Sequence, residues 1–90
     1  MGIKLHIHKT HRQFADGSEF VEVKGNKIGE CLDHLIIKYP DMREALFDKK
    51  GKLRNVIEIY VNMKSAYPDE LARIVSDGDE IHIIYLLTGG

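Results

Sequence analysis

The stretch Ile28-Gly29-Glu30-Cys31-Leu32-Asp33-His34-Leu35-Ile36-Ile37-Lys38-Tyr39-Pro40 decides the fold, because it holds the one long amphipathic helical pattern of this chain. Asn26 stands where a helix cap is expected, and Tyr39-Pro40 ends the pattern. We therefore expect one helix from Ile28 to about Lys38. Its apolar residues recur at helical spacing on a single face that must be buried: Ile28, Cys31, Leu32, Leu35 and Ile36.

On both sides of this helix, apolar and polar residues alternate, which is the period of a strand with one buried face. Before the helix, segments 3–9 and 20–24 flank the turn residues Asp16-Gly17-Ser18 and predict a hairpin. After the helix, segments 56–62 and 81–87 predict two further strands. Shorter helical turns are expected near residues 41–47, where Asp41 and Glu44 have capping-box spacing, and near residues 68–75.

The order strand, strand, helix, strand, strand predicts an α+β fold with one mixed sheet of four to five strands, covered on one face by the main helix. A right-handed crossover places the last strand parallel to the first in the middle of the sheet. This is the β-grasp, or ubiquitin-like, arrangement. We expect it to comprise residues 1–86, followed by a flexible Gly-Gly tail at residues 87–90.

Composition narrows the classes of function. Ninety residues suffice for one domain, which is too small for an enzyme with a deep pocket. A formal net charge of −1, without a basic cluster, argues against nucleic acid as a partner. The sequence shows neither an apolar run of membrane-spanning length nor a signal peptide, and Cys31 is its one cysteine. We expect a cytoplasmic protein that does not bind membranes.

Four stretches resemble a known family: Lys27-Ile28-Gly29-Glu30-Cys31-Leu32 with Lys38-Tyr39-Pro40, Tyr60-Val61-Asn62, Asp77-Gly78-Asp79-Glu80-Ile81, and Gly89-Gly90. In this order and spacing, the chain resembles the ubiquitin-like sulfur carriers of the MoaD/ThiS type, which include the small subunit of molybdopterin synthase and the thiamine-pathway sulfur carrier. The resemblance extends from the first strand to the last residue.

The resemblance implies that partner proteins perform the chemistry and that this chain is not itself an enzyme, although it could be the small subunit of a synthase. A ubiquitin-activating-type adenylyltransferase would use ATP to adenylate the Gly90 carboxylate. A sulfur donor would then convert the adenylate to a thiocarboxylate. A downstream synthase subunit would accept the sulfur. Gly89 and Gly90 lack a Cβ, so the tail is thin enough to enter a narrow active site. No bound cofactor is expected.

The sequence leaves open which biosynthetic pathway would receive the sulfur. Family tails often carry Val-Ala-Gly-Gly after prolines, whereas here Tyr85-Leu86-Leu87-Thr88 precede Gly89. Relatives of this shape serve molybdopterin, thiamine, cysteine or homocysteine synthesis and protein tagging, and a fold does not choose between them. Two alternatives also stay open: a ubiquitin-like modifier joined to target lysines through Gly90, and a non-covalent β-grasp interaction domain.

The outer face of the predicted sheet is the expected docking surface for partners. Alternation directs Tyr60, Ile84 and Leu86 away from the helix, beside His6 and His8. Apolar groups clustered on a face that is normally polar predict a contact with another protein. Two further residues, Leu87 and Thr88, would continue this surface into the tail.

A metal site on this face is not expected. Beside His6 and His8, the strand order brings His11 and His82 within reach, and imidazoles bind metals. However, the sequence fixes no acidic or thiol ligand nearby. Cys31 lies on the apolar face of the helix, where a thiol behaves as a small buried hydrophobe, so no catalytic role is expected for it.

Overall fold

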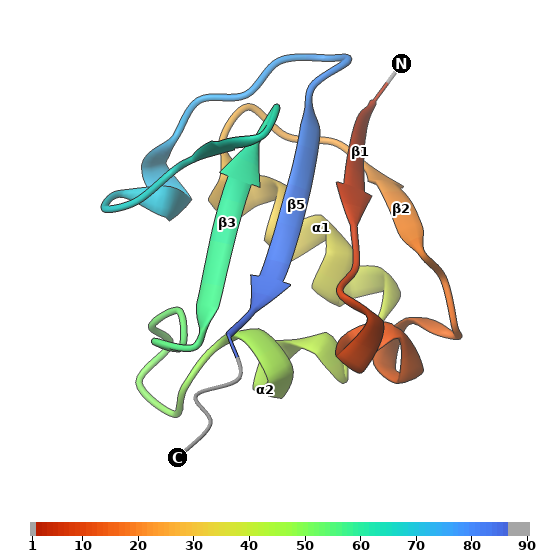
Figure 1. The fold of residues 1–90 in the computed structure, drawn as a ribbon. Coiled ribbons are helices and arrows are strands. Elements are labelled where there is room, and N and C mark those ends of the chain that lie inside the picture. The colour runs from red at the N-terminus through yellow and green to blue at the C-terminus, as the bar shows by residue number, and fades with distance from the viewer. Residues whose placement is uncertain (1, 87–90) are drawn as a thin grey trace.

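The computed structural model describes residues 2–86 of the 90-residue chain, as a five-stranded sheet with helices against one face and at one end (Figure 1). The strands lie in the order β2-β1-β5-β3-β4. Their bounds are Ile3–His6 for β1, Phe20–Val23 for β2, Ile57–Val61 for β3, Lys64–Ser65 for β4 and Glu80–Tyr85 for β5.

The sheet is mixed, as predicted. The first and last strands, β1 and β5, are parallel neighbours near its centre, and the other pairs, β1–β2, β3–β5 and β3–β4, are antiparallel. The main helix α1, Ile28–Lys38, lies across one face of this sheet (Figure 1). Both its bounds and its role as the covering helix confirm the sequence prediction.

The core lies between α1 and the sheet. Every predicted apolar residue of the helix face is buried, and Leu32 and Leu35 are completely so. The strands contribute the alternate residues that sequence alternation predicts, among them Ile3 and Leu5 on β1 and Ile81 and Ile83 on β5. The inward residues of β1 and β5 are therefore covered by the helix side of the fold, and the alternate residues of these strands lie on the opposite face.

Smaller helical elements close the ends of the core. A 3-10 helix, η1, comprises Lys9–Ala15, a short helix α2 comprises Met42–Leu46, and a 3-10 turn η2 comprises Glu70–Ala72. The predicted strand at residues 3–9 is too long, because the chain leaves the sheet after His6. The His8 side chain accepts a hydrogen bond from the Thr10 N–H at 3.2 Å, and this cap starts η1 instead.

Two predicted caps are wrong. Lys27, and not Asn26, occupies the N-cap position of α1, and its side chain makes no capping hydrogen bond. Glu30 supplies the local contact instead, since its carboxylate accepts a hydrogen bond from the Asn26 N–H at 2.8 Å. At α2, Asp41 takes the N-cap position in a helical conformation without a side-chain capping bond, so the capping box with Glu44 does not form.

A turn of residues 76–79 fixes the start of β5 against the end of β3. Gly78 adopts φ +91°, a backbone conformation that suits glycine. The Asp79 carboxylate accepts hydrogen bonds from the Ser76 N–H at 2.9 Å and from the Asn62 side chain at 3.0 Å, and these bonds hold its pKa below the usual value. Asn62 also accepts a bond from the Glu80 N–H at 3.0 Å, which places Glu80 at the first position of β5.

Candidate functional site

A row of four rings crosses the outer face of the sheet. The register pairs Phe20 with His6, His6 with His82, and His82 with Tyr60, so one residue from each of four adjacent strands contributes to the row. The rings of His6 and His82 stack, with centroids 4.0 Å apart and planes 3° from parallel. The Phe20 ring is tilted against His6 at 6.1 Å. The outer face therefore carries four aromatic and imidazole side chains in register across adjacent strands, which we call the ring row.

The structure brings most of the predicted docking residues to this face. A hollow of about 520 Å³ lies over the strands, and His6, His8 and Ile84 line it together with His82 and Phe20. Its rim includes basic side chains, since the remaining lining residues are Lys4, Ile7, Lys9, Arg12, Glu19 and Ile83. His8 reaches the hollow from beyond the end of β1, where it also caps η1.

Tyr60 lies on the other side of His82, and its hydroxyl donates a hydrogen bond to Glu58 at 3.1 Å. That bond and the negative charge of Glu58 raise the pKa of Tyr60. Leu86 follows β5 and is 40% exposed, while its N–H donates a hydrogen bond to the Val56 carbonyl at 2.7 Å. The remaining predicted site residues lie outside the described part of the chain: Leu87, Thr88, Gly89 and Gly90.

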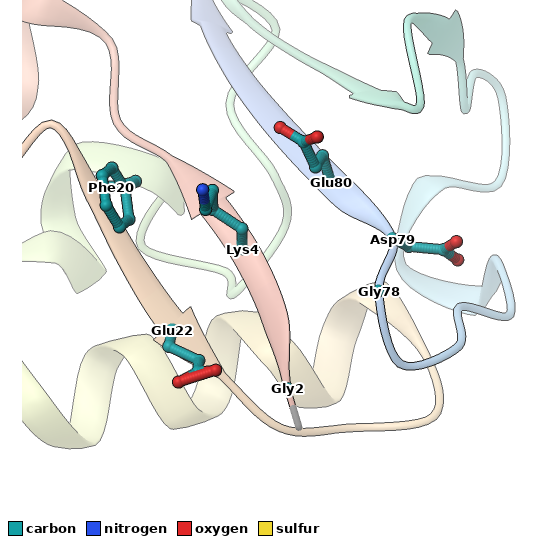
Figure 2. Close-up of a pocket in the computed structure, with 7 residues that line it drawn as sticks. All are labelled: Gly2, Lys4, Phe20, Glu22, Gly78, Asp79 and Glu80. Atoms are coloured by element: carbon teal, nitrogen blue, oxygen red, sulfur yellow. The ribbon is translucent and has the colours of Figure 1, made fainter.

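A row of alternating charges flanks the ring row. Lys4 lies between Glu22 of β2 and Glu80 of β5 in the register, and Figure 2 shows these three side chains together with Phe20. A smaller hollow of about 330 Å³ opens here, lined also by Gly2, Gly78 and Asp79. The Lys4 ammonium lies 4.5 Å from the centroid of the Phe20 ring, within the range of a cation–π contact.

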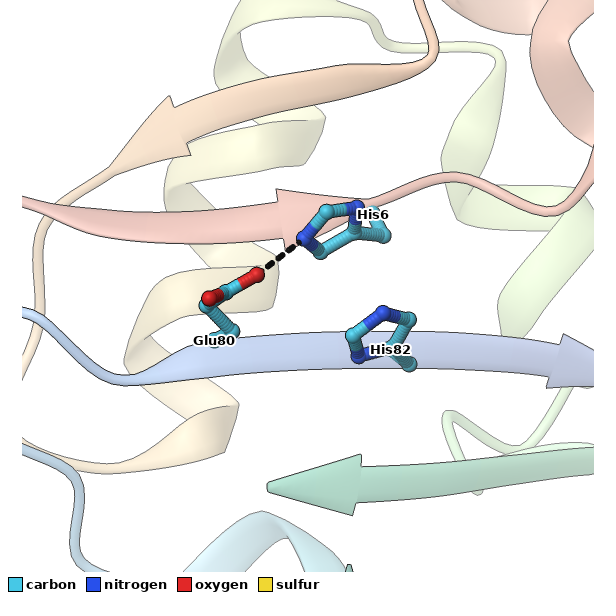
Figure 3. Close-up of side chains that lie close together, drawn as sticks. All are labelled: His6, Glu80 and His82. Atoms are coloured by element: carbon cyan, nitrogen blue, oxygen red, sulfur yellow. Dashed lines mark hydrogen bonds and ion pairs between the residues drawn. The ribbon is translucent and has the colours of Figure 1, made fainter. Parts of the chain in front are cut away.

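Glu80 and His6 join the two rows. Their side chains form a hydrogen bond of 2.7 Å, which lowers the pKa of the Glu80 carboxyl. Burial lowers the pKa of His82, and the adjacent His6 acts in the same direction. The sequence specified no acidic ligand near these histidines, but the structure places the carboxylate of Glu80 beside both imidazoles (Figure 3).

Two residues considered earlier do not belong to the outer face. His11 is buried within η1, where its ring meets that of Tyr85 edge-on at 5.1 Å. Cys31 is buried in the core, which confirms its predicted place on the apolar helix face. Conversely, the sequence analysis missed Phe20, which is half exposed in the ring row. The signal was present, since Phe20 alternates with the buried Val21 and Val23.

Comparison with known proteins identifies the family. The ThiS family model matches residues 6–90, which is nearly the whole sequence. The chain belongs to the ThiS family. This membership confirms the resemblance to ubiquitin-like sulfur carriers, and it identifies the chain as a small carrier protein rather than an enzyme. A search of curated protein sequences gives no significant match.

Solved structures agree with the ThiS assignment. A chain of the BexX/CysO complex from Amycolatopsis orientalis is 28% identical with a TM-score of 0.86, over 98% of this chain and 99% of that one. CysO from Mycobacterium tuberculosis is 27% identical with a TM-score of 0.86, over 94% and 99%. Small archaeal modifier protein 1 from Methanosarcina acetivorans is 27% identical with a TM-score of 0.82, over 98% and 95%. These likenesses confirm the predicted β-grasp fold.

The described part of the chain contains no membrane-spanning candidate, because no helix within residues 2–86 is long and apolar enough to cross a bilayer.

Proposed function

We propose that this ThiS-family protein carries sulfur as a thiocarboxylate on Gly90 and donates it in the synthesis of a cofactor or a sulfur-containing amino acid. One observation carries the proposal: the family match extends through residue 90 and so includes Gly89-Gly90. The absence of a Cβ at both positions suits a tail that must thread into the active site of another protein. The pathway that receives the sulfur is left open.

The proposed chemistry has three steps: adenylation and sulfur transfer, both catalysed by partners, and then reductive release. First, an oxygen of the Gly90 carboxylate attacks the α-phosphorus of ATP, and pyrophosphate leaves to give an acyl-adenylate. Next, the sulfur of a persulfide donor attacks the acyl carbon, and AMP leaves. A thiol reductant then breaks the sulfur–sulfur bond and releases the thiocarboxylate. Adenylation is needed because a free carboxylate is a poor electrophile, and the partner's task is to position the reactants.

The outer sheet face would hold the activating enzyme and then the sulfur-accepting subunit. Tyrosine and exposed apolar groups commonly form the centre of a protein interface, with charged groups at its rim. The ring row, Ile84 and Leu86 offer such a centre, and the row of Lys4 between two glutamates offers such a rim. The similarity to a chain of the BexX/CysO complex supports docking of this kind of fold to a partner enzyme.

Conjugation to proteins through Gly90 is the second candidate function, which the likeness to small archaeal modifier protein 1 favours. Intact-mass analysis of the untagged protein, isolated from its native host, separates the two. Replacement of one oxygen by sulfur in the free chain would support the carrier. Covalent adducts that end in a Gly90–lysine isopeptide would support the modifier. A free chain that never gains sulfur in the presence of its activating enzyme and sulfur donor would contradict the carrier. Both candidates assume a cytoplasmic protein, which stays a prediction.

A further inference from the structure

Three metal-binding side chains converge on the outer face of the sheet, on its two central strands. His6 of β1 and His82 of β5 are neighbours in the parallel register, and Glu80 precedes His82 by two residues on the same face of β5 (Figure 3). One potential ligand atom from each residue lies within 4.8 Å of the other two. Two imidazoles and one carboxylate form a ligand set that zinc accepts, with water in the fourth position.

The strand positions suit such a site better than a loop would. The pairs Lys4–Glu80, Leu5–Ile81 and His6–His82 lie in continuous register, so the backbone fixes the three Cα positions. On a tetrahedral ion, with bonds of about 2.0–2.2 Å, two ligand atoms lie roughly 3.4 Å apart. The present separations, all within 4.8 Å, exceed this by at most about 1.4 Å, a gap that side-chain rotations can close on a rigid sheet.

Binding would replace two contacts of the present structure. The imidazole rings of His6 and His82 are almost parallel, so their nitrogen lone pairs cannot meet at one ion until the rings rotate. The bond from His6 to Glu80 occupies one imidazole nitrogen and one carboxylate oxygen, both of which an ion would take over. The three side chains are thus held to one another by ring stacking and by one hydrogen bond.

An independent observation concerns His82. Its Nδ1 is buried and makes no hydrogen bond among the described residues. A buried polar atom without a partner is unfavourable, and most such atoms in folded proteins have a partner or an ion. Ring rotation that opens the stack would expose the His82 Nδ1, which makes no hydrogen bond among the described residues. Lys4 is the nearby charge that opposes a cation, and its ammonium is directed at the Phe20 ring.

We propose that His6, Glu80 and His82 form a binding site for one divalent transition-metal ion, of which zinc is the best fit, on the outer face of the sheet. The site needs neither the tail nor any cysteine. It is independent of the proposed sulfur chemistry, because the thiocarboxylate would form on Gly90 and none of the three residues takes part in that reaction.

The test is titration of untagged, chelator-treated protein with Co²⁺, followed by displacement with Zn²⁺. Visible absorption bands of tetrahedral cobalt should saturate at one ion per chain and disappear as zinc is added. The double variant His6→Gln/His82→Gln should bind more weakly by at least the roughly 10–100-fold that loss of an outer partner costs a metal site. His34→Gln is the matched control, since His34 accepts a hydrogen bond from the Lys24 N–H, away from the cluster.

NMR of the unmodified protein guards against a folding defect in the variants. On addition of zinc, the NMR resonances of the imidazole nitrogens of His6 and His82 should shift, while those of His34 should stay unchanged. The proposal is overturned if zinc leaves both cluster imidazoles unshifted, or if the double variant, folded by circular dichroism, binds cobalt as tightly as the unmodified protein. Equal loss of binding in His34→Gln would also overturn it.

Discussion

His6 and His82 stack ring on ring at 4.0 Å, although 75 residues separate them along the chain, because β1 and β5 are parallel neighbours in the sheet. This contact lies at the middle of the ring row, with Phe20 on one side and Tyr60 on the other. The centre of the candidate docking surface is therefore formed by side chains of β1 and β5, the two central strands of the fold. Side chains on these strands are held on a rigid base, which favours a preformed contact surface.

The docking surface is tested by Ile84→Asp. Ile84 lines the hollow of the outer face, so a charge there should weaken binding to the cognate activating enzyme about tenfold or more, as expected for a central interface residue. The fold should survive, since Ile84 does not belong to the core. Ile37→Asp is the matched control, because Ile37 is 78% exposed on α1. Equal affinities of the Ile84 variant and the control, measured by calorimetry, would place the surface elsewhere.

The core assignment is tested by Leu32→Ala. Leu32 is completely buried at the contact of α1 with the sheet, so truncation should lower the free energy of unfolding by about 2–5 kcal/mol. That loss is large beside the total of about 5–15 kcal/mol typical of small domains. A urea titration measures it, with Ile37→Ala as the exposed control on the same helix. A loss no larger than in the control would contradict the packing described here.

The Cys31 thiol should be unreactive in the folded protein. Burial, with a smaller contribution from Glu30, raises the pKa of this thiol to about 11, so the reactive thiolate is scarce and covered. A thiol reagent should therefore label Cys31 only through opening of the fold, and the destabilised Leu32→Ala variant should label faster. Labelling of the native chain at the rate of the urea-unfolded chain would show that Cys31 is exposed.

The sequence was sufficient where the signal is local. Apolar spacing along Ile28–Lys38 gives the helix and its buried face, and alternation gives the inward residues of the strands. The end of β1 was not predictable in this way, because the alternation continues to His8, where hydrogen bonds from the Thr10 and His11 N–H groups begin η1. Short 3-10 helices have no strong period of their own.

The grouping of Glu80 with the histidines depends on the register, which a single sequence states only indirectly. The predicted last strand began at residue 81 and so left Glu80 outside it, whereas the structure makes Glu80 the first residue of β5. Alternation extended back from the buried Ile81 would have placed Glu80 on the outer face. Its nearness to His6 still required the parallel pairing of β1 with β5.

Stability should decrease in mild acid because of His11. Burial against the Tyr85 ring, and secondarily the charge of His8, lower the pKa of His11 from its ordinary value. Below about pH 6.5, the unfolded chain therefore binds more protons than the folded one, so the free energy of unfolding decreases as the pH is lowered. Above that pH, His11 is neutral in both states and no longer makes stability depend on pH. One such group contributes at most about 1.4 kcal/mol per pH unit.

Urea titrations on either side of that pH measure this effect. His11→Phe should reduce the loss of stability in acid without abolishing it, since burial lowers the pKa of His82 as well. His34→Phe serves as the control, because His34 bonds the Lys24 N–H and lies apart from His11 and His82. An acid loss that is the same in the His11→Phe variant as in the unmodified protein would mean that His11 does not titrate as its burial implies.

The central claim is that Gly90 is the reacting residue, and ATP–pyrophosphate exchange with the cognate activating enzyme tests it most directly. The native sequence should support exchange. A chain lacking Gly90, or carrying one added residue after it, should not, while its thermal melting temperature stays essentially unchanged because residues at a chain terminus usually contribute little to the core. Equal exchange with the native chain and with the chain lacking Gly90 would contradict the carrier and the modifier proposals together.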